Sequence, residues 1–234
     1  MKKPETVFSL GASVVLIAVL FSGCLSPAAD TTALHQNPAL KSGSVYFAEA
    51  PRMATREKEL SECLFRVVGQ IAMRGEVRVR HTITDMGGGL MRRDTVLDYD
   101  QNNSIAILER LTVEQVVQTD HGTAALIRDT ARHPSGPRIA DGAGRDGRPE
   151  WIERPQSDTG FYMVVGMVNQ RTNRTDGFKN SDTDALGRLA AQVSNPLTQG
   201  TSRVHDVRMR GAWIVRRWYD AETGVYYSLA VLPR

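Results

Sequence analysis

Residues 214–231, IVRRWYDAETGVYYSLAV, read as a strand, a turn and a second strand. Asp220 to Gly224 supplies the turn, because glycine tolerates the positive φ that tight turns require. Residues 113–127, VEQVVQTDHGTAALI, have the same form, with Gly122 in the place of Gly224. These two stretches predict two antiparallel hairpins, one in each half of the chain.

Each hairpin closes a longer segment of similar design. The first segment runs from about Val45 to Asp129 and the second from about Phe161 to Arg234. Their further common landmarks are an aromatic opening strand (45–47 and 161–165) and a helix end that carries a glutamine (Gln70 and Gln192). Landmarks in the same order predict a tandem duplication. The alternative is that any two segments made of one helix and two strands look alike.

The helix in each segment is predicted from apolar spacing. In the first, apolar residues recur at i, i+4, i+7, i+8 and i+11: Leu60, Leu64, Val67, Val68 and Ile71. Cys63 borders this stripe and is expected to be buried as a small apolar residue. The second helix is predicted to begin near Ser181, because a serine followed by Asp184 resembles a capping box.

The strands that follow each helix alternate between apolar and basic side chains. Val77 and Val79 alternate with Arg78 and Arg80, and Val207 and Met209 alternate with Arg208 and Arg210. This alternation is typical of a sheet with one face toward solvent. The predicted fold class is α+β, with two similar small two-layer units. In each unit one helix packs on an antiparallel sheet of three to four strands.

The chain divides into five predicted regions. They are a signal peptide (1–23), a flexible tether (24–43), a diverged first unit (44–129), a linker rich in Pro and Gly (130–148) and a second unit (149–234). The first unit carries about 20 extra residues around 85–100, where Gly87, Gly88 and Gly89 are predicted to form a hairpin tip. Trp151 and Ile152, close to the linker, are expected to pack on the second unit.

The N-terminus indicates export and lipidation. Lys2 and Lys3 precede an apolar run from Val7 to Phe21, as in a secretory signal. Phe21, Ser22, Gly23 and Cys24 then resemble the bacterial lipobox, in which Cys24 is diacylated on sulfur, for example with palmitate, and becomes the first residue. The alternatives are a transmembrane anchor, or a signal that is cleaved elsewhere beside an incidental cysteine.

Composition excludes several classes of protein. The chain has 234 residues, 41% of them apolar and 24% charged, and a net charge of +3, which is too apolar and too balanced for a disordered chain. Two cysteines make neither a disulfide scaffold nor a CxxC zinc site. If Cys24 is lipidated, Cys63 has no partner, although an intermolecular disulfide is the alternative. No concentrated basic stripe indicates a nucleic-acid partner.

The sequence carries no signature of catalysis. Its five histidines lack metal-ligand spacing, and it has no HExxH, GxSxG or P-loop motif. We therefore expect a protein that is not an enzyme and that has no metal site and no cofactor. Four aromatic residues of the last hairpin are candidates for an interaction surface: Trp213, Trp218, Tyr226 and Tyr227. The alternative is cross-strand core packing. Tyr226 and Tyr227 must face opposite sides of their strand.

The second unit resembles the LPP-twenty family of bacterial lipoproteins. The resemblance covers about Glu150 to Arg234, and its most specific part is the closing pattern of Trp218, a D-x-x-T-G turn and Tyr226 before a leucine-containing strand. Supporting matches are PEWI (149–152), FYMVVG (161–166), LAAQVS (189–194) and the Cys24 lipobox. The resemblance implies a lipoprotein attached to the outer membrane, in some members associated with the flagellum, and it carries no catalytic residues.

The expected function is a non-catalytic scaffold or assembly role in the bacterial cell envelope. The protein would be lipid-anchored, most simply in the outer membrane facing the periplasm, and would have protein partners or self-assemble. The alternative is a binding or regulatory module that contacts peptidoglycan or an envelope enzyme. An apolar concavity with convergent polar groups between the two units would favour that alternative.

Overall fold

The computed structural model describes residues 31–119, 121–133, 136–140, 142–144, 147–155, 160–169 and 176–234. The described chain has an α+β fold with three antiparallel sheets. The residues predicted for signal cleavage and lipidation, Phe21 to Cys24, lie outside these ranges. In the part of the chain that is described, no helix is long and apolar enough to cross a membrane.

The first half builds a three-stranded sheet beneath one long helix. Its elements are β1 (Val45–Pro51), α2 (Arg56–Gly75), α3 (Ser104–Leu108), β4 (Leu111–Thr119) and β5 (Gly122–Asp129). The strand order is β1-β5-β4. The predicted apolar stripe of α2 packs on this sheet, and Cys63, Val67 and Ile71 join one buried cluster with Ile127. The helix and hairpin predictions for this half are confirmed.

The second half repeats this arrangement. Its elements are α4 (Glu150–Glu153), β6 (Phe161–Asn169), α5 (Gly177–Val193), β9 (Trp213–Asp220) and β10 (Val225–Pro233). The strand order β6-β10-β9 corresponds to β1-β5-β4, with the long helix after the first strand in both halves. Duplication of one ancestral unit remains a prediction that this likeness supports.

The start of α5 differs from the prediction. The helix begins at Gly177, four residues before Ser181, so Ser181 does not cap it. Ser181 is instead buried in the second turn, where its hydroxyl bonds to the Phe178 carbonyl at 3.1 Å and to the Ser228 hydroxyl at 2.7 Å. A small hydroxyl satisfied in this way can face a strand at close range.

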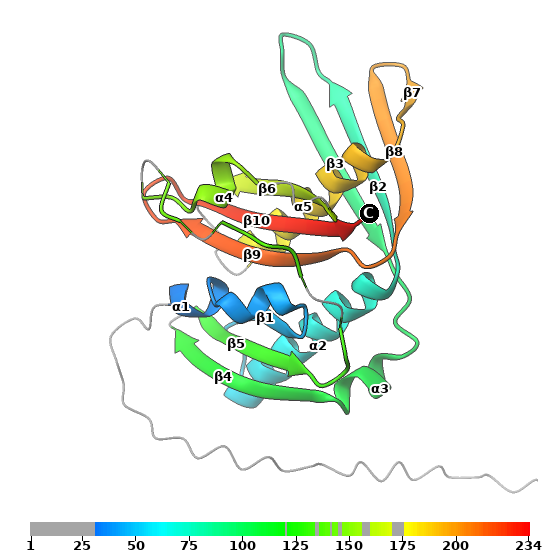
Figure 1. Cartoon of the computed structure of the whole chain (residues 1–234). Coiled ribbons are helices and arrows are strands. Elements are labelled where there is room, and N and C mark those ends of the chain that lie inside the picture. The colour runs from blue at the N-terminus through cyan, green and yellow to red at the C-terminus, as the bar shows by residue number, and fades with distance from the viewer. Residues whose placement is uncertain are drawn as a thin grey trace, which may run out of the picture.

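The third sheet contains strands of both halves, whereas the sequence predicted a sheet of three to four strands for each unit. It contains β2 (Val77–Asp85), β3 (Met91–Asp98), β7 (Leu197–Gln199) and β8 (Ser202–Met209), in the order β3-β2-β8-β7. Val79 of the first half pairs with Val207 of the second. The strands β2 and β8, each with one face toward solvent, are therefore neighbours in one sheet. Helix α5 covers their common apolar face. Figure 1 shows this sheet projecting from the body as two adjacent hairpins.

The segment before β1 is folded, so the prediction of a tether over 24–43 is wrong for its described part. Residues 31–43 contain α1 (Thr32–His35) and η1 (Pro38–Ser42). Leu34 and Leu40 are fully buried and pack in one cluster with Phe178 of the second half. Two leucines are enough to hold this otherwise small and polar segment against the folded body. Burial of each leucine side chain stabilises the fold by about 2 kcal/mol.

The linker region carries no helix or long strand where it is described. Within 130–148, Ala143 forms an isolated bridge with Pro149, and Ile139 packs against the second half's sheet. Trp151 is buried in that same cluster. The expectation that the Trp151–Ile152 pair packs on the second unit is confirmed.

Candidate ligand-binding cleft

The four aromatic residues predicted as an interaction surface are core residues. Trp213, Tyr226 and Tyr227 are buried and Trp218 is half-buried. Tyr226 meets Phe178 of α5 with ring centroids 5.0 Å apart, whereas Tyr227 meets Trp218 on the other face at 5.7 Å. The two tyrosines do face opposite sides, as predicted. The surface prediction is wrong because both faces of the hairpin are covered, one by α5 and the other by α4 and the linker.

Cys63 is buried, and its thiol is a poor nucleophile. Its sulfur lies 3.5 Å from the Thr123 carbonyl oxygen and 3.8 Å from that of Ala48. Burial raises the pKa of the Cys63 thiol to about 12, so the thiolate that nucleophilic chemistry needs is scarce at neutral pH. Its predicted burial is confirmed. No group of three metal-ligating side chains occurs among the described residues.

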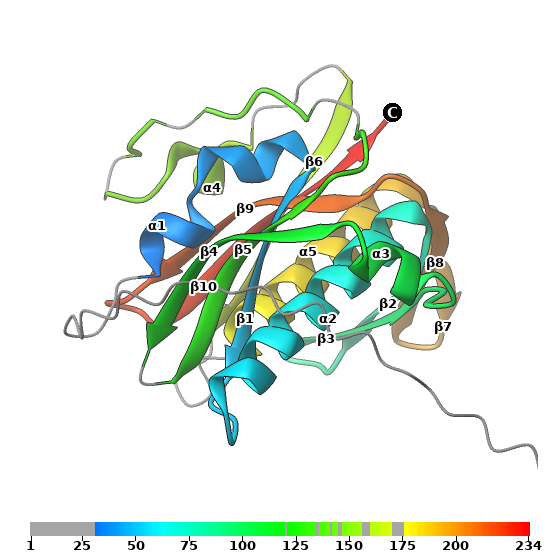
Figure 2. The ribbon, with the colours of Figure 1, turned by 90° about the horizontal axis from the view of Figure 1, so that it is seen from below.

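A cavity of about 500 Å³ lies between α2 and α5, the long helices of the two halves. Figure 2 shows these helices running alongside each other. We call this cavity the inter-helix cleft. One end of it is apolar, and the residues there belong to the cluster under α5: Met73, Leu97, Tyr99, Leu186 and Ile214. Because both helices and β3 contribute to the wall, the cleft exists only when the two halves are joined.

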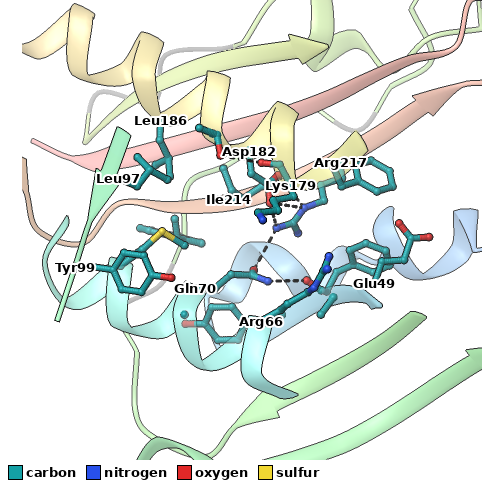
Figure 3. A pocket seen from close by; sticks show the side chains of 18 of the residues that line it. Glu49, Arg66, Gln70, Leu97, Tyr99, Lys179, Asp182, Leu186, Ile214 and Arg217 are labelled. Carbon is teal, nitrogen blue, oxygen red and sulfur yellow. Dashed lines mark hydrogen bonds and ion pairs between the residues drawn. The ribbon is translucent and has the colours of Figure 1, made fainter. Parts of the chain in front are cut away.

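A buried ion pair forms the floor of the cleft (Figure 3). Arg217 of β9 is 2% exposed, and its Nη2 donates to Asp182 Oδ2 at 2.7 Å, while its Nε donates to Asp182 Oδ1 at 3.0 Å. Arg217 Nη2 also donates to Gln70 Oε1 at 3.2 Å. Since a buried guanidinium must be paired to avoid a desolvation cost of several kcal/mol, Asp182 is required for Arg217 to lie there.

Three further groups complete the hydrogen-bond network around this pair: the Gln70 side chain, the Phe47 carbonyl and the Ser228 hydroxyl. Gln70 Nε2 donates to the Phe47 carbonyl at 2.9 Å, and the Ser228 hydroxyl donates to Asp182 Oδ1 at 2.6 Å. Both Gln70 and Phe47 belong to the first half, whereas Asp182 and Ser228 belong to the second. The network therefore holds the polar groups of the floor in fixed positions across the junction of the halves.

The other end of the cleft is charged. Its side chains include Glu49 of β1, the α2 pair Glu62–Arg66 (2.8 Å) and Lys179 of α5. Glu49 is partly buried, and no described residue donates a hydrogen bond to its carboxylate. Burial raises the pKa of the Glu49 carboxyl to about 7, and the positive charges of Arg66 and Arg217 only partly oppose this. The charge of this end therefore changes near neutral pH.

Two features of α2 keep the cleft accessible. Phe65 lines the cleft with 58% of its surface exposed, so this part of the wall is open to solvent. Gly69 lies one turn further along, where an added Cβ would come within 3.0 Å of the Tyr99 hydroxyl oxygen. A glycine at this helix position costs about 1 kcal/mol relative to alanine, and it leaves room beside Tyr99.

The arrangement suits binding of an amphipathic molecule. Its volume lies within the range of about 300–1,000 Å³ that is typical of small-molecule sites, and it combines an apolar end with a charged end. The cleft residues Glu49, Asp182 and Arg217 were not candidates from sequence. Gln70 was noted only as a landmark of duplication. Arg217 follows Arg216 on a strand, so the sequence around it carries no signal of its burial, which depends on the distant helix α5.

No protein-family model, no curated protein and no solved structure matches this chain.

Proposed function

We propose that this protein is a lipid-anchored bacterial envelope protein that acts without catalysis, as a binding module for an amphipathic ligand. The ligand would lie in the inter-helix cleft with its apolar part beside Tyr99 and its polar part beside Glu49. The observation that carries this proposal is the cleft itself. It is an apolar concavity with convergent polar groups between the two halves, which is the feature expected of a binding module rather than of a scaffold.

The anchor in this proposal is the lipid on Cys24. A cysteine with two or three acyl chains holds a protein stably on a membrane. Since folded structure is described from Thr31 onward, residues 24–30 separate the lipid from the body. Seven residues reach at most about 24 Å, so Thr31 would stay within about that distance of the membrane surface. Leu25, rather than an aspartate, follows Cys24 and favours sorting to the periplasmic face of the outer membrane.

The scaffold or assembly role, including a flagellar one, is the weaker candidate. It rests on the resemblance of residues 150–234 to the LPP-twenty family. The aromatic hairpin that was its expected contact surface is buried, as Tyr226 and Tyr227 show. The edge strands of the described sheets, β3 and β7 among them, are the remaining support for it.

A titration with N-phenyl-1-naphthylamine, a neutral apolar fluorophore, tests the binding proposal. Dye fluorescence should rise and saturate with one site per chain. Gly69→Leu should fill the space beside Tyr99 and weaken binding about tenfold or more. Gly75→Leu is the matched control, because a Cβ on this α2 residue meets nothing within 4 Å. Equal binding by the Gly69→Leu and Gly75→Leu variants, with unchanged thermal melting, would contradict a ligand site in the cleft.

A further inference from the structure

The hairpin of β2 and β3 ends in an exposed apolar tip. Met86, Leu90 and Met91 are 60%, 70% and 44% exposed. Between them, Gly87, Gly88 and Gly89 all have positive φ, at +82°, +62° and +80°, and a Cβ on any of them would meet nothing within 4 Å. The tip therefore stands in open space, and its large apolar side chains contribute nothing to any of the four buried clusters.

The neighbouring hairpin of β7 and β8 braces this tip. The Asp85 amide donates to the Thr201 carbonyl at 3.0 Å, and the Thr84 and Ser202 hydroxyls lie 2.8 Å apart. Figure 1 shows the two hairpins extending together, away from the other two sheets. The apolar side chains are thus presented at the end of a rigid arm.

Two arginines lie in one row behind the tip. Ile83 pairs with Arg93 of β3 on one side and with Arg203 of β8 on the other, so all three side chains share one face of the sheet. Both arginines are exposed, and neither forms an ion pair with a described residue. The row of Asp85 and Met91 lies two residues nearer the tip, a distance of about 7 Å along the strands.

The remaining charges near the tip leave it mildly basic. Arg92 pairs with Asp94 at 2.9 Å, and the Asp85 carboxylate accepts from the Gly87 amide at 2.8 Å. Three arginines (Arg92, Arg93 and Arg203) against two aspartates give a net charge of 3 − 2 = +1.

We propose that this tip is a membrane-contact site for an anionic bilayer. Met86, Leu90 and Met91 enter the boundary between headgroups and acyl chains, while Arg93 and Arg203 bind lipid phosphates. Apolar groups at such interfaces enter the boundary between headgroups and acyl chains by about 5–10 Å, which agrees with the separation of about 7 Å between the apolar and arginine rows. Each basic residue near an anionic surface strengthens binding about fivefold.

A bilayer fits the shape of the tip better than a second protein copy does. A stable protein interface buries about 800 Å² on each partner, over a surface that is usually flat or complementary. The tip is the narrow end of a hairpin and exposes only three large apolar side chains, Met86, Leu90 and Met91. Fluid lipid can surround a narrow convex tip without a preformed pocket.

Vesicle co-sedimentation tests this proposal on the chain from Leu25 onward, which has no lipid anchor. This chain keeps the whole folded core, because the four buried clusters contain only residues between Leu34 and Leu232. It should bind vesicles of phosphatidylglycerol and phosphatidylcholine and bind pure phosphatidylcholine more weakly. Leu90→Asp should reduce binding about tenfold. The control Ile105→Asp, at a residue of α3 that is 74% exposed, should leave binding unchanged.

The arginine row has its own variants. Arg93→Gln with Arg203→Gln should remove the preference for phosphatidylglycerol, and Arg208→Gln, on the opposite face of the same sheet, should retain it. The proposal is overturned if the chain does not sediment with anionic vesicles, or if Ile105→Asp reduces binding as much as Leu90→Asp. It is also overturned if Leu90→Asp abolishes a dimer in sedimentation velocity while vesicle binding persists.

Discussion

Arg217 and Asp182 form a buried ion pair that lies between the two halves of the molecule. Arg217 extends from β9 and Asp182 from α5, and their closest atoms are 2.7 Å apart. Gln70 of α2 bonds to the same guanidinium at 3.2 Å. One pair therefore both closes the floor of the inter-helix cleft and connects the helix of the first half to the second half.

Replacing Arg217 with methionine should destabilise the fold. It leaves the Asp182 carboxylate without its cation, and removal of one partner of a buried pair costs about 3–5 kcal/mol. Arg208→Met is the control, because its side chain is exposed and its contact with Glu76 is 3.7 Å long, so it should change stability by less than about 1 kcal/mol. Urea unfolding at pH 7 measures both. Equally small losses of unfolding free energy in both variants would show that the Arg217–Asp182 pair does not stabilise the fold.

The charged end of the cleft should bind anions more tightly at pH 6 than at pH 8. The pKa of Glu49 is about 7, so its carboxyl is mostly neutral at pH 6 and mostly ionised at pH 8. The cleft then loses one negative charge beside Arg66 and Arg217 as the pH falls. The anionic fluorophore 1-anilinonaphthalene-8-sulfonate should bind several times more tightly at pH 6, by about 1 kcal/mol.

Glu49→Gln should remove most of that pH dependence and bind the dye at pH 8 as the parent does at pH 6. Glu114→Gln should retain the dependence, since Glu114 lies on β4 outside the cleft. Persistence of the full pH dependence in Glu49→Gln would show that another group controls the charge of the site.

The contribution of His81 to stability should be lost as the pH drops below 6.5. His81 and His205 face each other across β2 and β8, with ring centroids 6.4 Å apart. Desolvation by burial lowers the pKa of His81, helped by the charges of His205, Arg93 and Arg188 and opposed by Asp184. A folded-state pKa below the unfolded value means that the unfolded chain binds more protons, so the contribution is present above pH 6.5 and is lost on acidification.

The measurement for His81 is the free energy of unfolding at pH 7 and at pH 5. Glu49 has the opposite linkage, because its raised pKa makes the folded state bind more protons between pH 4.5 and 7. Relative to pH 7, His81→Gln should therefore be more stable at pH 5 than the parent chain, whereas His121→Gln, in an exposed turn, should behave as the parent does. An identical loss in both variants would place the acid sensitivity elsewhere.

Lipidation should depend on Cys24 alone. Cells grown with labelled palmitate should label the parent chain and the Cys63→Ala variant, because Cys63 is buried and cannot be acylated in the folded protein. The Cys24→Ala variant should carry no label. Label retained in Cys24→Ala would contradict the anchor in the proposed function.

The sequence predicts local structure well here and long-range structure poorly. The alternation around Val79 and around Val207 correctly indicates a wet face on each strand, and the stripe that contains Val67 correctly places α2 on its sheet. Nothing local shows that Val79 and Val207 are partners, because the same alternation suits two separate sheets. The shared sheet, and with it the cleft, is a property of the assembled fold.

The sequence also fails to predict which polar residues and which isolated apolar residues are buried. Arg217 stands beside Arg216 in a strand and reads as a solvated charge, yet Asp182 and Gln70 pair with it inside the fold. Leu34 and Leu40 are too few to show a helical period, although both are completely covered. In each case the partner comes from a distant part of the chain, so no window of sequence around the residue contains the information.

Native mass spectrometry of the lipidated chain, extracted from its own membrane, tests the central claim most directly. The claim predicts that the parent chain and Gly75→Leu each carry one additional small amphipathic molecule, and that Gly69→Leu carries none. A parent chain without any bound molecule, or a Gly69→Leu variant with the same occupancy as Gly75→Leu, would contradict a binding function for the inter-helix cleft.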